Sequence, residues 1–204
     1  MSDHQHANIR NEIEPLESRR VLSVSLDDDG RLRVNGDNDD NEITFDRVGG
    51  TLIVDEDGRE SALDASDITF IDIDGHGGND LIDLRDGRLR ADVEGGAGDD
   101  TLLGSAGRDT LEGDAGRDLI KGFKGNDKLE GSEGRDTVRG GVGNDKIEGG
   151  ADRDFLFGDA GNDVLESDED GFRDFVSGGP GADRGEVDNG TIDDDVDGIE
   201  VFDD

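Results

Sequence analysis

The stretch GSAGRDTLEGDAGRDLIKGFKGNDKLE, residues 104–130, repeats one nine-residue row three times. Each row has glycine at its first and fourth positions, aspartate at the sixth and an aliphatic residue at the eighth. In an extended segment neighbouring side chains face opposite ways, so the eighth residue points inward while the seventh and ninth point outward. The other residues reverse the chain, and glycine supplies the backbone conformations that tight turns require. Each row therefore predicts a turn followed by a very short strand.

The same register extends over residues 75–186, interrupted by two eleven-residue rows at 84–94 and 167–177. Alternating turns and strands predict a flattened coil with two rows per lap, in which rows 18 residues apart stack directly. The expected fold class is all-β, a β-solenoid with a thin core. Its inward residues are Ile82, Val93, Leu102, Leu111, Ile120, Leu129, Val138, Ile147, Leu156, Leu165 and Val176.

The composition by itself favours disorder. The net charge is −35, only 29% of the residues are hydrophobic, and 34 are glycine. The strict spacing of the glycines indicates an ordered repeat instead. The negative charge argues against nucleic acid and anionic membranes as partners and favours cations.

Several classes of site and segment are excluded by what the chain lacks. It contains no cysteine, so disulfides and thiolate metal sites are excluded, and His4, His6 and His76 are too few to favour a zinc cluster. Membrane insertion is not expected, because no apolar run approaches the length of a membrane helix. The N-terminus also lacks the apolar core of a standard secretory signal.

The regions outside the repeats have their own patterns. Residues 1–20 are polar and are predicted to form a flexible tail. Residues 21–74 alternate apolar and polar residues between turn signals, which is typical of short strands. Within them GDNDDNEIT, residues 36–44, resembles a degenerate row and suggests that the coil begins before residue 75. Residues 187–204 are expected to cap the open end of the stack.

The sixth-position aspartates should form two files along the edges of the coil. Carboxylates stacked at strand spacing, about 4.8 Å, repel one another, so a cation between neighbours is expected. The glycine turns direct carbonyl oxygens toward the same gaps, and oxygen-only coordination favours Ca²⁺; Mg²⁺ is the weaker candidate because it requires a tighter octahedron. The five gaps of the first file and the four of the second would hold up to nine Ca²⁺ ions. The predicted ligands are Asp80, Asp100, Asp118, Asp136, Asp154 and Asp174 in the first file, and Asp109, Asp127, Asp145, Asp163 and Asp183 in the second. The alternative for any single aspartate is turn formation alone, since aspartate readily bonds its own backbone.

These rows resemble the G-G-x-G-x-D-x-U-x calcium-binding nonapeptide of RTX proteins. The resemblance covers roughly residues 75–186. It implies a parallel β-roll, Ca²⁺ held between rows two apart, disorder without Ca²⁺, and secretion of the unfolded chain by a bacterial export apparatus.

Some rows depart from the family pattern. Ala91 stands where row 84–94 should have its aspartate, so this row should bind poorly, and Asp152 replaces the fourth glycine of its row, which should strain the turn or add an oxygen ligand. Gly185 replaces the aliphatic residue of the last row. Arginine fills the fifth position as Arg108, Arg117, Arg135, Arg153 and Arg173, which we interpret as surface charge balance, with binding of an anionic partner as the sharper alternative.

The function expected first is calcium binding by a monomeric, extracellular or cell-surface structural module that folds on binding Ca²⁺. The alternative is a calcium-stabilised adhesion or surface-layer scaffold, with a cell-surface or extracellular partner touching Phe155, Phe157, Phe172 and Phe175; the simpler explanation for these rings is packing under the irregular row 167–177. An enzyme is not expected, because residues 1–74 contain neither HExxH nor GxSxG and are too short for a protease or lipase domain.

Overall fold

The computed structural model describes residues 23–85, 87–167, 172–186, 195–197 and 199–201. The predicted tail, residues 1–20, lies outside the described residues, as does most of the predicted cap at 187–204. Every regular element in the described part is a β-strand. No helix there has the length and apolar character needed to cross a membrane.

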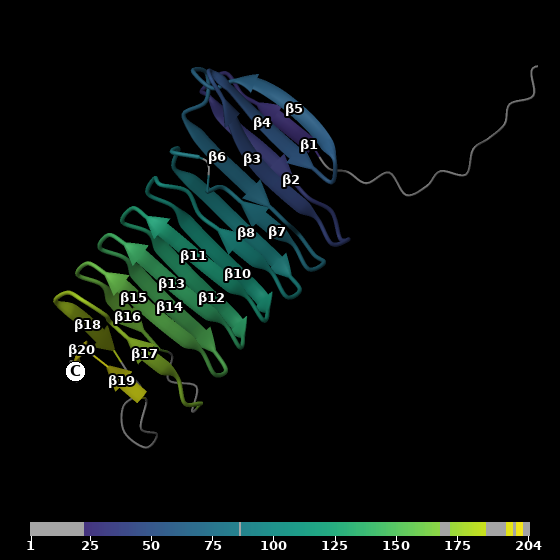
Figure 1. Ribbon diagram of the computed structural model, residues 1–204. Coiled ribbons are helices and arrows are strands. Elements are labelled where there is room, and N and C mark those ends of the chain that lie inside the picture. Colours follow the sequence, from purple (N-terminus) through teal and green to yellow (C-terminus); the bar gives the residue numbers. More distant parts are fainter. Residues whose placement is uncertain (1–22, 86, 168–171, 187–194, 198, 202–204) are drawn as a thin grey trace, which may run out of the picture.

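The strands form two ten-stranded sheets (Figure 1). In spatial order the first sheet contains β1 (Ser23–Leu26), β2 (Arg31–Asn35), β6 (Phe70–Asp74), β8 (Ala91–Ala97), β10 (Thr110–Gly116), β12 (Lys128–Gly134), β14 (Lys146–Ala151), β16 (Val164–Glu166), β18 (Asp183–Glu186) and β20 (Ile199–Val201). The second contains β19 (Asp195–Asp197), β17 (Phe175–Ser177), β15 (Phe155–Ala160), β13 (Thr137–Val142), β11 (Leu119–Lys124), β9 (Thr101–Leu103), β7 (Leu81–Asp83), β3 (Glu42–Val48), β4 (Thr51–Glu56) and β5 (Arg59–Asp64).

From β6 onward the chain alternates between the two sheets, and each strand pairs in parallel with the strand one lap away. Leu111 of β10 lies beside Leu129 of β12, and Ile120 of β11 lies beside Val138 of β13. Both offsets are 18 residues, as the row length requires. Figure 1 shows the resulting stack, which runs from the teal strands to the yellow ones. The prediction of a parallel β-roll is confirmed.

Each row contributes one aliphatic side chain to the core of the repeats. All eleven eighth-position residues, from Ile82 to Val176, are at most 1% exposed. Their neighbours at the seventh and ninth positions, such as Thr110 and Glu112 around Leu111, lie on the outer surface. The alternation predicted for each row is therefore observed, and few apolar atoms hold any one lap to the next.

The N-terminal strands are built differently. β1 pairs with β2, and β3, β4 and β5 pair successively, all in antiparallel fashion. Three of these strands, β2, β3 and β4, each bury two inward apolar residues, namely Leu32 and Val34, Ile43 and Phe45, and Leu52 and Val54. Parallel pairing already begins at β2 with β6 and at β3 with β7, so coil geometry starts before residue 75.

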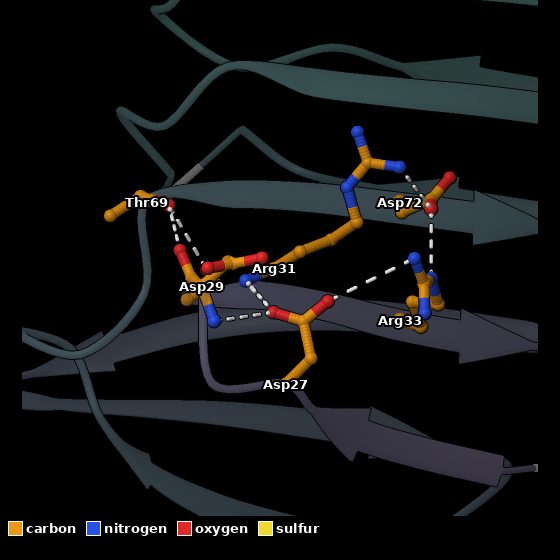
Figure 2. Close-up of polar contacts among 7 residues, drawn as sticks. Asp27, Asp29, Arg31, Arg33, Thr69 and Asp72 are labelled. Atoms are coloured by element: carbon orange, nitrogen blue, oxygen red, sulfur yellow. Dashed lines mark hydrogen bonds and ion pairs between the residues drawn. The ribbon is translucent and has the colours of Figure 1, made fainter.

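Polar contacts fasten this N-terminal end to the coil (Figure 2). Arg31 and Arg33 of β2 both donate to Oδ2 of Asp72 on β6, at 3.1 and 3.2 Å. In the turn between β1 and β2, Oδ1 of Asp27 accepts hydrogen bonds from the N–H groups of Asp29 and Arg31. The N–H of Arg31 is the main reason why the pKa of Asp27 lies below its usual value. Asp27 and Asp72 therefore find their partners within the protein.

Candidate metal centre

The eleven sixth-position aspartates occupy equivalent places at the ends of the turns, and each is at most 3% exposed. We name the two sets file one and file two. File one contains Asp80, Asp100, Asp118, Asp136, Asp154 and Asp174, and file two contains Asp109, Asp127, Asp145, Asp163 and Asp183. Aspartate is seldom buried without a partner, so the arrangement requires a physical explanation.

One carboxylate oxygen of each aspartate has a partner in the neighbouring lap. The N–H of Asp100 donates to Oδ1 of Asp118 at 2.7 Å, and the N–H of Asp118 donates to Oδ1 of Asp136 at 2.8 Å. The same bond, 2.7–2.9 Å long, joins every successive pair in both files. These bonds hold the carboxylates in the stacked order that the row length predicts.

The other oxygen, Oδ2, is the unusual one. In most rows of the described structure this Oδ2 atom is buried and has no hydrogen-bond partner. This holds for Asp80, Asp100, Asp118, Asp127, Asp136, Asp145, Asp163 and Asp183. A buried ionised oxygen without a partner costs several kcal/mol at most sites, because water no longer solvates it. A row of such atoms indicates that something other than the protein satisfies them.

The electrostatics of the files agree with this reading. Burial raises the pKa of Asp80, Asp118 and Asp127 to about 7. It raises the pKa of Asp136 and Asp163 to about 6. The backbone N–H bonds oppose the shift, while neighbouring carboxylates add to it, as Asp136 and Asp100 do at Asp118. At neutral pH the files need positive charge, either as protons or as metal ions.

Backbone carbonyl oxygens converge on the same places. A Cβ added to Gly122 would lie 2.5 Å from Oδ2 of Asp127 and 2.8 Å from the carbonyl oxygen of Gly140 in the next lap. A Cβ on Gly95 would lie 2.7 Å from Oδ2 of Asp100 and 2.9 Å from the carbonyl oxygen of Gly113. Glycine at the first position therefore keeps open a small space that a carboxylate oxygen and a carbonyl oxygen both face.

These oxygens fit a hard cation. The described residues contain no cluster of three or more His, Cys, Asp or Glu side chains suited to a metal, so each gap offers two carboxylates at most and otherwise carbonyl oxygens. Calcium accepts this mixture of carboxylate and backbone carbonyl ligands, whereas zinc prefers nitrogen and sulfur. Neighbouring aspartates of one file are the residues that would hold each ion. Their assignment as ligands stays a prediction.

In the lap before each file, the position equivalent to its aspartates holds an uncharged residue, Asn41 before Asp80 and Ala91 before Asp109. The N–H of Asn41 donates to Oδ1 of Asp80 at 2.7 Å, and the N–H of Ala91 donates to Oδ1 of Asp109 at 2.9 Å. Asn41 is 3% exposed, and its Oδ1 faces Gly36 as the aspartate oxygens face their own first-position glycines. The degenerate row at residues 36–44 was the sequence signal for Asn41. At this position the amide replaces the charge of an aspartate.

A second ladder, which sequence reasoning did not identify, runs along the fifth position. Oδ1 of Asn126 accepts the N–H of Asn144 at 2.9 Å, and Oδ1 of Asn144 accepts the N–H of Asn162 at 2.8 Å. Asp40, Asn79 and Asp99 continue the pattern at the other edge. The fifth-position arginines are exposed, consistent with their interpretation as surface charge. Asp152, in place of a fourth glycine, adopts φ 81°, a left-handed conformation that aspartate tolerates better than most residues.

Comparison with known families agrees with this chemistry. The family model of the RTX calcium-binding nonapeptide repeat (4 copies) matches residues 94–129, 103–138 and 130–165. No curated protein and no solved structure matches the chain. The matched residues cover the most regular laps of the coil, from β8 to β16. The chain therefore carries RTX calcium-binding nonapeptide repeats at residues 94–165.

Proposed function

We propose that this protein is an extracellular structural module whose coil becomes ordered when Ca²⁺ binds between neighbouring aspartates of each file. The observation that carries the proposal is the row of buried Oδ2 atoms without hydrogen-bond partners. Bound calcium would supply the positive charge that these oxygens lack. A chain of net charge −35 would gain most from ions that bind only its folded form.

The chain's own residues define where positive charge is needed. The backbone N–H bonds to Oδ1 hold successive carboxylates in register, for example Asp100 to Asp118 at 2.7 Å. The first-position glycines, such as Gly122, leave room beside Oδ2. The inward aliphatic residues align the laps. Together these features preorganise paired carboxylates, which reduces the cost of gathering ligands around an ion.

Folding on binding follows from the balance between core and charge. Each row buries one aliphatic side chain, and rows such as that of Asp118 also bury a carboxylate whose pKa is raised by burial. Calcium sites in extracellular modules bind in the range of about 10⁻⁴ to 10⁻³ M. A chain with sites of that affinity would remain unfolded in a low-calcium cytosol and would fold outside the cell.

A calcium titration tests this proposal. Circular dichroism should show a cooperative gain of strand signal as Ca²⁺ is added to chelator-treated protein, and equilibrium dialysis should count several ions per chain. Magnesium at the same concentrations serves as the control and should produce a much smaller gain. A chelator-treated chain with the full strand signal would contradict folding on binding.

The proposal gives the chain no catalytic role. The buried carboxylates lie in regular files, and each accepts a backbone N–H on Oδ1. An acid–base pair requires two carboxyl groups that face a substrate cleft. A structural role also agrees with the matched repeats, since the RTX β-roll is a structural calcium-binding module.

A second candidate function, adhesion, is favoured by an aromatic cluster on the outer face of the second sheet. The Phe157 and Phe175 rings lie 5.5 Å apart, the Phe155 and Phe175 rings lie 6.3 Å apart, and Phe172 nearby is 52% exposed. Part of the irregular row that was expected to cover these rings, residues 168–171, lies outside the described residues. Replacing Phe157 and Phe172 by serine should abolish attachment to a cell surface if the cluster binds a partner. Retained attachment by a variant that still folds with calcium would exclude this role.

A further inference from the structure

Row 104–112 reads like its neighbours but is built differently. Building on the calcium-binding function proposed above, we propose that hydrogen bonds from Ser105 satisfy the carboxylate of Asp109, so that Asp109 holds the coil together without binding metal. File two would then bind its first ion between Asp127 and Asp145.

The carboxylate of Asp109 is surrounded by donors from the protein. The N–H of Ser105 donates to Oδ2 at 2.7 Å, and the N–H of Ala91 donates to Oδ1 at 2.9 Å. The hydroxyl of Ser105 lies 2.9 Å from Oδ2 of Asp109 and 2.9 Å from the carbonyl oxygen of Leu89, and its single proton serves one of them at a time. Both carboxylate oxygens therefore accept a backbone hydrogen bond whichever way the hydroxyl turns.

The next aspartates of both files lack such a hydrogen-bond donor at Oδ2. Asp127, one lap further along file two, accepts the N–H of Asp109 on Oδ1, but its buried Oδ2 has no hydrogen-bond partner. Asp118, in the row that follows Ser105 along the chain, shows the same pattern with the N–H of Asp100. A calcium ion gains most where an oxygen is unsatisfied, and at Asp109 it would have to displace hydrogen bonds that already exist.

A second serine at the same position in its row provides an internal control. Row 131–139 begins GSEGRDT and row 104–112 begins GSAGRDT, so Ser132 corresponds to Ser105. Ser132 has φ 80°, in line with the left-handed second positions of other rows, such as Asp114 and Phe123. Oδ2 of Asp136, the aspartate of the Ser132 row, has no hydrogen-bond partner. Ser105 does not have a positive φ, and neither does Gly107 after it.

The cause of this difference is the irregular row beneath. Row 104–112 stacks on row 84–94, where the N–H of Ala106 donates to the carbonyl oxygen of Gly87 at 3.3 Å. The hydroxyl of Ser105 also accepts the N–H of Gly107 at 2.8 Å, which tightens the turn. Arg90 of the irregular row lies close enough to favour the ionised form of Asp109, although burial still raises the pKa of that carboxyl. The row thus places donors and positive charge where other rows leave an oxygen unsatisfied.

The proposal predicts a graded loss of ions within file two. Each ion is shared by two neighbouring carboxylates, and the gap between Asp109 and Asp127 is closed. Asp109→Asn should therefore remove no ion, Asp127→Asn should remove one, and Asp145→Asn should remove two. If all gaps were open, the corresponding losses would be one, two and two.

Equilibrium dialysis against radioactive Ca²⁺ at saturation, with the full chain, measures these differences. Asp183→Asn, at the other end of file two, should remove one ion. Equal losses for Asp109→Asn and Asp183→Asn would overturn the proposal, while several bound ions in the unmodified chain would still support the proposed function. No bound calcium in any variant would instead defeat the proposed function itself.

A second pair of variants tests the role of Ser105 directly, even if Asp109→Asn does not fold. Ser105→Gly removes the hydroxyl bonds to Leu89 and Gly107 that shape this turn, so residue 105 can adopt the positive φ of the second position in other rows. In those rows Oδ2 of the aspartate has no partner, as at Asp118, so the calcium count should rise by one, whereas Ser132→Gly should leave it unchanged. Slower exchange of the Ser105 amide than of the Ser132 amide, measured in saturating calcium in the unmodified chain, would report the hydrogen bond to Asp109. An unchanged count in Ser105→Gly would overturn the assignment.

Discussion

The N-terminal strands, residues 23–74, and the regular laps, residues 113–166, share parallel stacking but are held together in different ways. At the N-terminal end Asp72 receives Arg31 and Arg33 (Figure 2), and each strand from β2 to β4 buries a pair of inward side chains or more. In the regular laps each row buries one aliphatic residue and one carboxylate, and in several rows, such as those of Asp118 and Asp127, one carboxylate oxygen has no hydrogen-bond partner. Asp72 in the first region is neutralised by arginines of the protein, whereas on the proposed function cations neutralise the carboxylates of the second.

Glu56 is an exception, because it is a buried carboxylate of the N-terminal region with an unpartnered oxygen. It lies in the N-terminal region, is 5% exposed, and its Oε1 has no hydrogen-bond partner among the described residues. Burial raises its pKa. A single such group can take up a proton near its raised pKa, whereas two files of them accumulate repulsion along the whole coil.

The largest expected effect is on how stability depends on pH. Asp80, Asp118 and Asp127 have a pKa of about 7 in the folded chain and near the ordinary value of 3.8 when unfolded. A raised folded-state pKa means that the stabilisation by protons is complete below pH 3.8 and is lost as the pH rises through about 6 to 7. The calcium-free coil should thus be more stable at pH 5 than at pH 8, by on the order of several kcal/mol.

Thermal unfolding followed by circular dichroism, in calcium-free buffer at both pH values, measures this difference. In saturating calcium the dependence should reverse, because protons compete with the ion for the same oxygens. Calcium-free stability that rises with pH would show that the files are not the groups that control folding.

The next effect concerns the core. Leu129→Ala, in a regular lap, and Leu52→Ala, in β4, each remove a buried leucine and should cost about 2 to 5 kcal/mol. If the laps fold with calcium as proposed, the Leu129 variant should raise the calcium concentration needed for folding. The Leu52 variant should lower the stability of β3 to β5 to denaturant whether or not calcium is present. Chemical denaturation at several calcium concentrations separates the two; identical calcium dependence would remove the distinction between the regions.

A smaller effect is expected from filling the space beside one carboxylate. Gly122→Ala places a methyl group 2.5 Å from Oδ2 of Asp127 and should raise the calcium midpoint about tenfold, equivalent to about 1.4 kcal/mol. Gly50→Ala is the matched control in the N-terminal region, because a Cβ there meets nothing within 4 Å. Equal calcium midpoints for the two variants would show that the space at Gly122 is not used by an ion.

The smallest effect belongs to the exposed ion pairs of the N-terminal end. The side chain of Arg33 is 49% exposed and lies 3.2 Å from Asp72, so Arg33→Ala should cost at most about 1 kcal/mol. The loss should shrink as salt is added and should not depend on calcium. A calcium-dependent loss, measured by denaturation, would link this region to the files.

Much of this architecture was predictable from the spacing of residues. The nine-residue period determines which residue points inward and which aspartates stack, and Leu111, Leu129, Asp118 and Asp136 are all found as expected. The hydrogen bonds to both oxygens of Asp109 were not predictable from its own row, because Ser105 and Ser132 stand in nearly identical sequences. The difference arises from the row on which each one stacks, and that contact involves residues 16 or more positions away. The fifth-position ladder was missed because asparagine side chains in turns also bond locally.

Amide hydrogen exchange with and without calcium at pH 7.5 tests the central claim most directly. Removal of divalent ions should speed exchange by at least about a hundredfold, or about 2.7 kcal/mol, for amides of the regular laps such as those of Ile120 and Leu129, while Val34 and Leu52 of the N-terminal strands keep their protection. Equal protection of both regions in the absence of divalent ions would contradict the account, because it would show that the stacked carboxylates need no cation.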